Sequence, residues 1–518
     1  MTAPSVEFSL LAPVLIVLGV AVAGVIVEAF LPRRARYATQ VSLSLAGLLT
    51  AFGALVEVYR TTGAGRTAAV GAVVIDRPGL FLQGVILVVA VFSVLLIGER
   101  RDGFDSGASG LDAFTAQAST VPGSLAEKIA TTAKVTQTEV FPLTMFAVGG
   151  MMIFTAAGDL LTMFIALEVL SLPLYLMCGL ARFRRLQSQE ASLKYFLLGA
   201  FSSAFFLYGM ALLYGYAGTL SLTGIAEALR TGPENTTLAL IGAALVSVAL
   251  LFKVGAVPFH SWVPDVYQGA PTAITGFMAA ATKIAAFGAL MRVLYVAVPA
   301  LKDDWRPVLW AVAILTMAVG TVAAVTQRDV KRMLAYSAIA HTGFILVGVI
   351  ADNPSGVSGT LFYLAAYGFS TVGAFAVVSV VRGSDGAEQT ALDRWAGLGR
   401  RHPLTGLVFA LFLLAFAGIP LTSGFVGKFA VFSAAGEGGA IPLVIVGVLT
   451  SAIAAYFYVR VIVLMFFTDA PQDAPRVAPP GALTIMAIGL TALITLLLGA
   501  LPQPLLDLAD SATGFLTS

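Results

Sequence analysis

Long apolar runs separated by short polar segments fill almost the whole of this sequence. Fourteen of these runs could cross a bilayer, since about 20 apolar residues span its hydrocarbon core. They lie near 8–31, 38–58, 79–98, 140–157, 159–181, 191–216, 237–268, 272–298, 307–326, 332–351, 356–381, 403–432, 441–467 and 481–503. The pattern predicts an all-α polytopic membrane protein with about fourteen transmembrane helices.

Composition agrees with this class and excludes several others. Of the 518 residues, 58% are hydrophobic and 11% charged, whereas about 25% is the usual charged share in soluble proteins. The formal net charge of +2 gives no reason to expect nucleic acid as a partner. A single cysteine and three scattered histidines argue against disulfides, metal sites, iron–sulfur clusters and haem. We therefore expect no metal or cofactor in this chain.

The lysines and arginines predict the orientation of the spans. Loops after odd-numbered runs hold eighteen of them, and loops on the opposite side hold six. Because cytoplasmic loops are enriched in these residues, the bias predicts both termini outside the cytoplasm. The polar stretch 99–138 is then a cytoplasmic loop insertion, with a short helix expected near 124–134. A second cytoplasmic connection is expected at 383–402.

Three pairs of segments indicate an internal repeat. DLLTMFIALE (159–168) is similar to RMLAYSAIAH (332–341), YFLLGAFS (195–202) to YLAAYGFS (363–370), and GAVPFHS (255–261) to AGIPLTS (417–423). Spans 4–8 and 9–13 are therefore predicted to be two copies of a five-helix unit, inverted because the number of crossings is odd. The third pair predicts that spans 7 and 12 are discontinuous, at Pro258 and Pro420.

The repeat divides the chain into five predicted parts. These are spans 1–3 (1–98), the loop insertion (99–138), the first repeat (139–300), the second repeat (301–470), and the last span with the C-terminus (471–518).

Several ionisable residues lie inside the predicted spans, where a lysine at the bilayer centre costs ~2.5–3.5 kcal/mol on insertion scales. The candidate proton-relay residues are Glu168, Lys194, Lys253, His260, Lys283, His341 and Lys428. Each has a structural alternative: hydrogen bonding between helices for Glu168, core packing for the histidines, and snorkelling to the interface for Lys194. One carboxylate among several lysines and histidines favours proton transfer over sodium binding.

The break in span 7 suggests how the relay is built. Lys253 lies about one turn before Pro258, where unpaired carbonyls and the negative end of the helix dipole suit an ammonium group. We expect the break at Pro258 to free carbonyls and admit water, with His260 as the next proton carrier. Arg292 and Arg460 are expected simply to snorkel.

Three stretches carry a family resemblance: KVGAVPFHSWVPDVYQGAP (253–271), VKRMLAYSAIAHTGF (330–344) and GIPLTSGFVGKF (418–429). They resemble the signature stretches of the antiporter-like subunits of respiratory complex I. That superfamily also includes the large subunits of Mrp sodium/proton antiporters and of membrane-bound hydrogenases. The chain is most similar to the N-type subunits of the bacterial enzyme. We expect no long lateral helix of the kind that L-type subunits carry after the fourteenth span. Span 12 contains Lys428, and the first span ends VEAFLPRRAR.

This resemblance implies a proton-translocating membrane-arm subunit of a bacterial plasma-membrane NADH:quinone oxidoreductase. NADH, FMN, iron–sulfur clusters and quinone would lie on other subunits, which are the implied partners together with the lipid bilayer. Quinone reduction elsewhere would alter the pairing of Glu168 with Lys253 and send a proton towards Lys428.

The resemblance also implies that Lys194 lies beside this pair and that His260 and Lys283 carry the proton along the midplane. The alternatives are a subunit of an Mrp-type antiporter and a purely structural scaffold.

Overall fold

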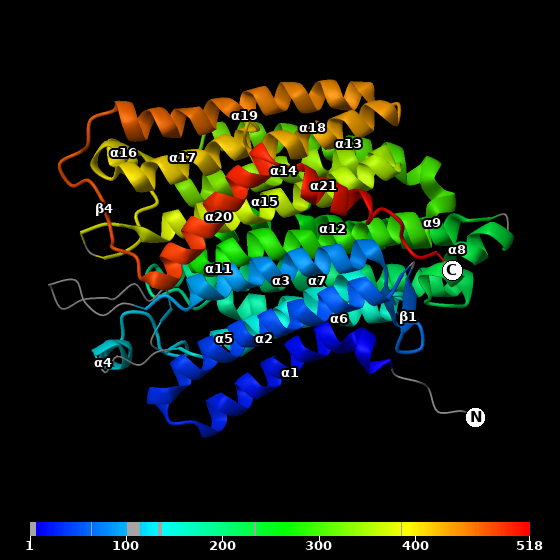
Figure 1. Cartoon of the computed structure of the whole chain (residues 1–518), viewed down its shortest axis with the longest axis horizontal. Helices are drawn as coiled ribbons and strands as arrows, with labels where there is room; N and C mark the ends of the chain where they lie inside the picture. Colours follow the sequence, from blue (N-terminus) through cyan, green and yellow to red (C-terminus); the bar gives the residue numbers. More distant parts are fainter. Residues whose placement is uncertain are drawn as a thin grey trace.

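A computed structural model describes residues 7–63, 65–100, 114–115, 117–132, 137–232, 235–384 and 386–517. Long helices lie side by side along one common direction and form the body of the protein (Figure 1). Among the described residues, twelve helices are long and apolar enough to cross a membrane. The predicted all-α membrane class is therefore confirmed.

The first three predicted spans are α1 (Phe8–Phe30), α2 (Arg33–Thr61) and α3 (Arg77–Ile97). Spans 4–7 are α5 (Val140–Ala156), α6 (Leu160–Cys178), α7 (Arg185–Ala217) and the pair α9 (Thr237–Val254) and α10 (Trp262–Gly269). Span 8 is one rod built from α11 (Thr272–Phe277), η1 (Met278–Thr282), α12 (Lys283–Arg292) and η2 (Val293–Ala297).

The second half continues with η3 (Pro299–Leu301), α13 (Lys302–Val325), α14 (Val330–Ala351) and α15 (Pro354–Val380). It ends with the pair α17 (Pro403–Ala417) and α18 (Ser423–Glu437), followed by α19 (Ile441–Phe467) and α20 (Ala482–Ala500). Every predicted span thus coincides with a helix or with successive helices. Because α5 and α17 are shorter than the twelve long spans, the count of fourteen stays a prediction.

Short elements close the two ends of the bundle. These are α4 (Leu125–Thr132), α8 (Leu222–Thr231), η4 (Leu392–Trp395), α16 (Leu398–Arg401) and α21 (Gln503–Asp510), with two antiparallel ladders, β1 (Arg66–Ala68) with β2 (Val73–Ile75) and β3 (Val381–Arg382) with β4 (Arg476–Val477). The helix predicted near 124–134 is α4, although 101–113, 116 and 133–136 of the insertion lie outside the described residues. Helix α21 was not predicted.

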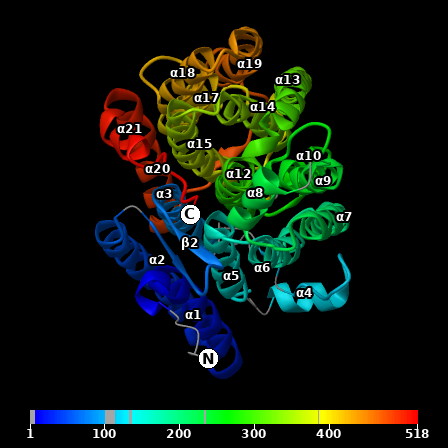
Figure 2. The same ribbon diagram turned by 90° about the vertical axis from the view of Figure 1, so that its right-hand side faces the viewer.

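The most deeply buried spans are the rod α11–η2, α14 and α15, whereas α1, α7, α19 and α20 lie on the outside. An end-on view shows α12, α14 and α15 surrounded by the other helices (Figure 2). Lys283 and His341 lie on these inner helices, so ionisable side chains are buried in the core of the bundle. Any partner for these side chains must come from within the bundle.

The predicted repeat has a matching backbone feature in each half. In the first, the amide of Leu160 donates to Leu220 O (3.0 Å) and that of Leu222 to Gly158 O (3.0 Å). In the second, Val330 N donates to Thr390 O (2.7 Å) and Leu392 N to Arg328 O (2.8 Å).

Every residue of the second pairing lies 170 positions after its counterpart in the first. The bridge at Asp159 lies near α8 and the bridge at Asp329 near α16, at opposite ends of the bundle (Figure 1). This relation supports an inverted repeat, whose full extent stays a prediction. The start of α1 and the end of the described chain lie at the α8 end (Figure 1).

Spans 7 and 12 are discontinuous, as predicted, but the residue that ends each first helix is a glycine. Gly255 (φ 77°) follows α9 and Gly418 (φ 78°) follows α17. The next amides, of Ala256 and Ile419, bond back to Leu251 O and Leu414 O. This is the Schellman type of helix end, which needs a left-handed residue that glycine adopts without a steric penalty. Pro258 and Pro420 lie within the two breaks, a few residues after these glycines.

Candidate functional site

Lys253 lies in the last turn of α9 and is 4% exposed. Its ammonium donates to the Ser171 hydroxyl of α6 (2.7 Å) and to the Tyr195 hydroxyl of α7 (3.2 Å). A buried lysine held by two neutral hydroxyls keeps its hydrogen bonds whether it gains or loses a proton, because hydroxyls donate as well as accept. The site is therefore suited to a lysine that changes charge.

Glu168 lies on α6 but does not contact Lys253 directly. Its carboxylate accepts a hydrogen bond from Ser203 of α7, and among the described residues no ion pair joins it to a lysine. Helix α7 thus contributes both the partner of Glu168 and, at Tyr195, a partner of Lys253. The Glu168 carboxylate on α6 and the Lys253 ammonium on α9 thus interact electrostatically without a direct contact.

Lys283 lies immediately after the π-helical turn η1, within the most buried rod. Its ammonium donates to Ala338 O (2.6 Å) and to the Thr342 hydroxyl (2.6 Å), both on α14. The Thr342 hydroxyl in turn donates to Val254 O (2.8 Å), the carbonyl next to Lys253 at the end of α9. Thr342 therefore links the two lysines through one hydroxyl and one peptide group.

His341 is the neighbour of Thr342 and is fully enclosed. Its Nδ1 lies 2.7 Å from the Tyr363 hydroxyl and its Nε2 lies 3.3 Å from the Tyr458 hydroxyl. The ring of Tyr367 lies 4.8 Å from the imidazole and 5.5 Å from the ammonium of Lys283. A cavity beside His341 has about 10 Å³ of space for a water centre, close to the minimum for one water.

Lys428 of α18 caps the broken end of α17. Its ammonium donates to Phe416 O (2.9 Å), Ala417 O (2.9 Å) and the Ser451 hydroxyl (2.8 Å). A lysine at a helix C-terminus satisfies orphan carbonyls and the dipole together. Gly418 leaves room for it, since an added Cβ would lie 2.9 Å from Lys428 Cδ.

These contacts form one continuous series across the molecule. Lys253 connects to Lys283 through Thr342, and the Tyr367 ring lies between Lys283 and His341. The imidazole of His341 lies 5.6 Å from the Phe416 ring, whose backbone carbonyl binds Lys428. The structure brings four predicted residues, Lys253, Lys283, His341 and Lys428, into this series.

Two predicted residues lie apart from it. Lys194 pairs with Glu190 (2.6 Å) and with Asp265 of α10 (2.7 Å), and its side chain is 41% exposed. The carboxylate of Asp265 also pairs with Arg332. His260 is half-buried in the connection between α9 and α10, and its Nδ1 has no hydrogen-bond partner among the described residues.

The hydroxyl partners were missed from the sequence. Ser171, Tyr195, Thr342, Tyr363, Tyr458 and Ser451 hold the buried cations and the imidazole. Their common signal is a hydroxyl within an apolar helix. Such residues also bond their own helix carbonyls, so the sequence alone does not distinguish the two uses.

Arg292 contradicts the expectation that it snorkels. It is 1% exposed and binds Asp76 with both terminal nitrogens, at 3.0 and 2.8 Å, while its Nε donates to Thr155 O (2.9 Å). Asp76 also caps α3 by accepting from Gly79 N. Arg292 is held by a bidentate pair that ties span 8 to span 3. Arg460, by contrast, donates to Val325 O near the outer surface.

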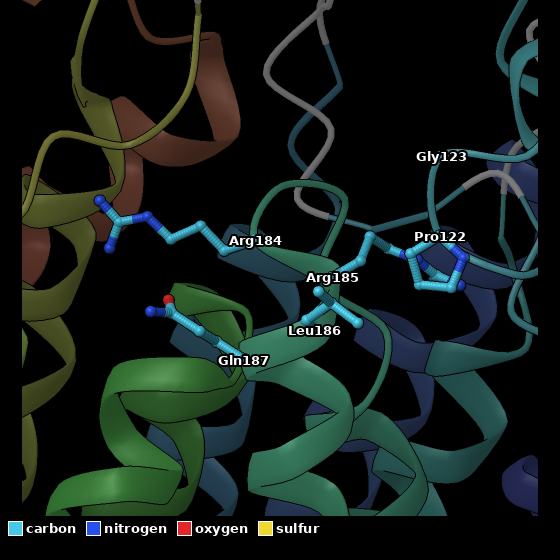
Figure 3. Close-up of a pocket in the computed structure, with 6 residues that line it drawn as sticks. All are labelled: Pro122, Gly123, Arg184, Arg185, Leu186 and Gln187. Carbon is cyan, nitrogen blue, oxygen red and sulfur yellow. The ribbon is translucent and has the colours of Figure 1, made fainter.

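An open pocket of about 390 Å³ lies at the start of α7, between Arg184, Arg185, Leu186 and Gln187 and the turn at Pro122 and Gly123 (Figure 3). The side chain of Arg185 points towards Pro122 and that of Arg184 points away from it (Figure 3). No predicted relay residue lines this pocket.

The family described as NADH:quinone oxidoreductase/Mrp antiporter, transmembrane, matches residues 157–454. The chain belongs to this family. The matched segment contains all seven predicted relay residues, from Glu168 to Lys428. It also contains both broken helices and most of the predicted repeat.

Curated relatives match over nearly their full length. NADH-quinone oxidoreductase subunit N of Rhodococcus opacus is 64% identical, with 99% of this chain and 97% of the relative covered. The protein of the same name from Mycobacterium tuberculosis is 63% identical, with 99% of each covered.

Among solved structures, a chain of respiratory complex I from Thermus thermophilus is 32% identical, with a TM-score of 0.76 and coverage of 96% of this chain and 99% of that one. A chain of the Mrp complex from Dietzia sp. has a TM-score of 0.79 at 22% identity, with 98% of each covered, and shares the fold.

Proposed function

We propose that this chain is a membrane-arm subunit of a proton-translocating NADH:quinone oxidoreductase. Full-length similarity to relatives named as subunit N of that enzyme supports this assignment. The chain would carry no redox centre and would use energy from quinone reduction on other subunits. Its partners would be those subunits and the lipid of the bacterial plasma membrane, with both termini outside the cytoplasm.

Protons would pass along Lys253, Lys283, His341 and Lys428. The observation that carries this proposal is the Thr342 hydroxyl, which bonds both the Lys283 ammonium and the carbonyl beside Lys253. Buried cations without carboxylate partners are costly and usually functional in membrane proteins. Hydroxyls, the imidazole of His341 and single waters would complete the path between them.

Glu168 would control this path by its charge rather than by direct contact. Because Ser203 and Tyr195 both belong to α7, a movement of that helix would change the hydrogen bonds of Glu168 and of Lys253 together. Lys194 and His260 would act beside this path, outside the series of buried residues. Lys194 shares the Asp265 carboxylate with Arg332.

The competing function is that of an Mrp-type antiporter subunit. Its support is a shared fold at 22% identity, against 60% or more for several relatives named subunit N. The neighbouring genes discriminate between the two. Genes for NADH- and iron–sulfur-binding subunits support the first function, and genes for small Mrp subunits support the second.

Replacing Thr342 by valine tests the link between the lysines. The variant keeps the shape of the side chain and removes the hydroxyl that joins Lys283 to Val254 O. We expect NADH-driven proton pumping to fall several-fold in inverted membrane vesicles, while NADH oxidation by a water-soluble acceptor is unchanged.

The matched control is Thr321→Val on α13, because the buried Thr321 hydroxyl has no hydrogen-bond partner among the described residues. It should pump as the unmodified complex does. Equal pumping by both variants would contradict a role for Thr342 in the path.

A further inference from the structure

A small polar cavity lies where the two predicted repeats meet, at the end of the bundle predicted to face the cytoplasm. Arg182, Gln268 and Ala270 line it from the first repeat, and Lys331, Arg382 and Glu388 from the second. Its space for water centres is about 30 Å³. At ~10–15 Å³ for each water, two or three waters fit.

Lys331 forms the inner wall of this cavity and is 2% exposed. Its ammonium donates to Ala270 O (2.7 Å), in the turn between α10 and α11. It lies in the first turn of α14, where the partial positive charge of the helix end disfavours a cation. Burial adds a desolvation cost that a direct carboxylate partner would offset, and the described residues provide no such ion pair.

Glu388 is the carboxylate of the cavity. It accepts from the Thr272 hydroxyl (2.5 Å), lies 3.7 Å from Arg382, and has a side chain that is 18% exposed. The charged and titratable groups that act on Lys331 are the carboxylates of Glu388 and Asp329, the guanidinium of Arg184 and the thiol of Cys178. Arg184 also reaches the backbone carbonyl of Glu388.

Helix α10 connects the cavity to the surroundings of Lys253. Ala270, the C-cap residue of α10, accepts the hydrogen bond of the Lys331 ammonium (2.7 Å). Helix α10, which borders the cavity, also places Trp262 against Tyr195, with rings stacked at 4.6 Å. Tyr195 is the second hydroxyl partner of Lys253.

We propose that Glu388 and Lys331 are the proton-uptake residues of this chain. This proposal rests on the proposed function and adds the step before Lys253. A hydronium ion in the cavity gives its proton to the Glu388 carboxylate and becomes water. A cavity water then carries the proton from Glu388 to the neutral amine of Lys331, since the cavity holds both side chains and two or three waters. The resulting ammonium gives up one proton inwards, through the groups that lie between it and Lys253, so that Glu388 and Lys331 return to their starting charges.

Two substitutions of Lys331 separate this role from a structural one. Lys331→Arg keeps the charge and a donor for Ala270 O, but arginine does not release its proton in proteins. Lys331→His can release a proton in the physiological range. We expect Lys331→Arg to assemble with proton pumping reduced about tenfold or more, since positioned proton carriers contribute factors of ~10²–10⁴.

We expect Lys331→His to recover pumping as the pH falls towards about 6.5, the ordinary pKa of histidine. If Lys331 were only a structural cation, Lys331→Arg would pump at a nearly normal rate and Lys331→His would be impaired at every pH. That result would overturn the proposal. Lys302→Arg is the control, because Lys302 forms a part-exposed ion pair with Asp352 at the opposite end of α14.

Glu388→Gln provides a second test that does not depend on how Lys331 variants assemble. The amide keeps the size of the side chain and cannot carry a proton, so pumping should again fall about tenfold. Full pumping by Glu388→Gln would overturn the proposal. If the Lys331 and Glu388 variants pump normally while Lys283→Met does not, proton uptake follows another route and the proposed function stands.

Discussion

Replacing Lys283 by methionine is expected to abolish NADH-driven proton pumping while leaving the complex assembled. Methionine matches the length of the aliphatic stem and removes the ammonium that bonds Ala338 O and Thr342. The side chain is buried and both partners of its ammonium are neutral, so methionine leaves no unpaired charge behind. Pumping should fall by about tenfold or more, measured as acidification of inverted vesicles.

The matched control for this prediction is Lys302→Met. Lys302 begins α13 and its side chain is 42% exposed, and surface ion pairs of this kind contribute ~0–1 kcal/mol. Pumping by the control should remain normal. If Lys283→Met pumps normally as well, the ammonium of Lys283 is not part of the path.

Breaking the pair between Arg292 and Asp76 is expected to have the largest effect on stability. Replacing Arg292 by methionine leaves the fully buried Asp76 carboxylate without its bidentate partner. Removing one member of a buried ion pair costs ~3–5 kcal/mol. We expect a marked fall in the thermal unfolding midpoint of the purified complex and less assembled subunit in the membrane.

A double variant identifies the cause of this loss. Asp76→Asn combined with Arg292→Met removes both charges and keeps an N-cap for α3, since asparagine caps helices as well as aspartate does. It should be more stable than Arg292→Met alone. Arg230→Met, which breaks the exposed pair with Glu227, should be near neutral. A double variant less stable than Arg292→Met would contradict the account.

The sequence predicts the large features of this fold because each has a local cause. Apolar runs of bilayer length become helices, and the matching segments at 255–261 and 417–423 become two broken spans. Each predicted proline lies within the break, but it is not the residue that ends the helix. Proline is the more visible signal, but the left-handed conformation at Gly255 and Gly418 is what ends each helix.

The candidate site was predictable only as a set of charged positions. Lys253 and Lys194 are both lysines in apolar spans, yet one binds buried hydroxyls and the other a surface carboxylate. Lys331 lies close to Arg328 and Arg332 in the sequence, and such a group of basic residues is typical of a cytoplasmic loop. In the structure its side chain is buried. Which side chain faces which helix depends on packing between segments more than 50 residues apart.

The central claim is that protons move through this chain along its buried lysines. The most direct measurement is the number of protons pumped for each NADH oxidised by assembled complexes that carry Lys253→Ala or Lys428→Ala. Lys253 and Lys428 stand at the two ends of the observed series. The account predicts a reduced ratio for each variant. An unchanged ratio in both, with normal assembly, would contradict it.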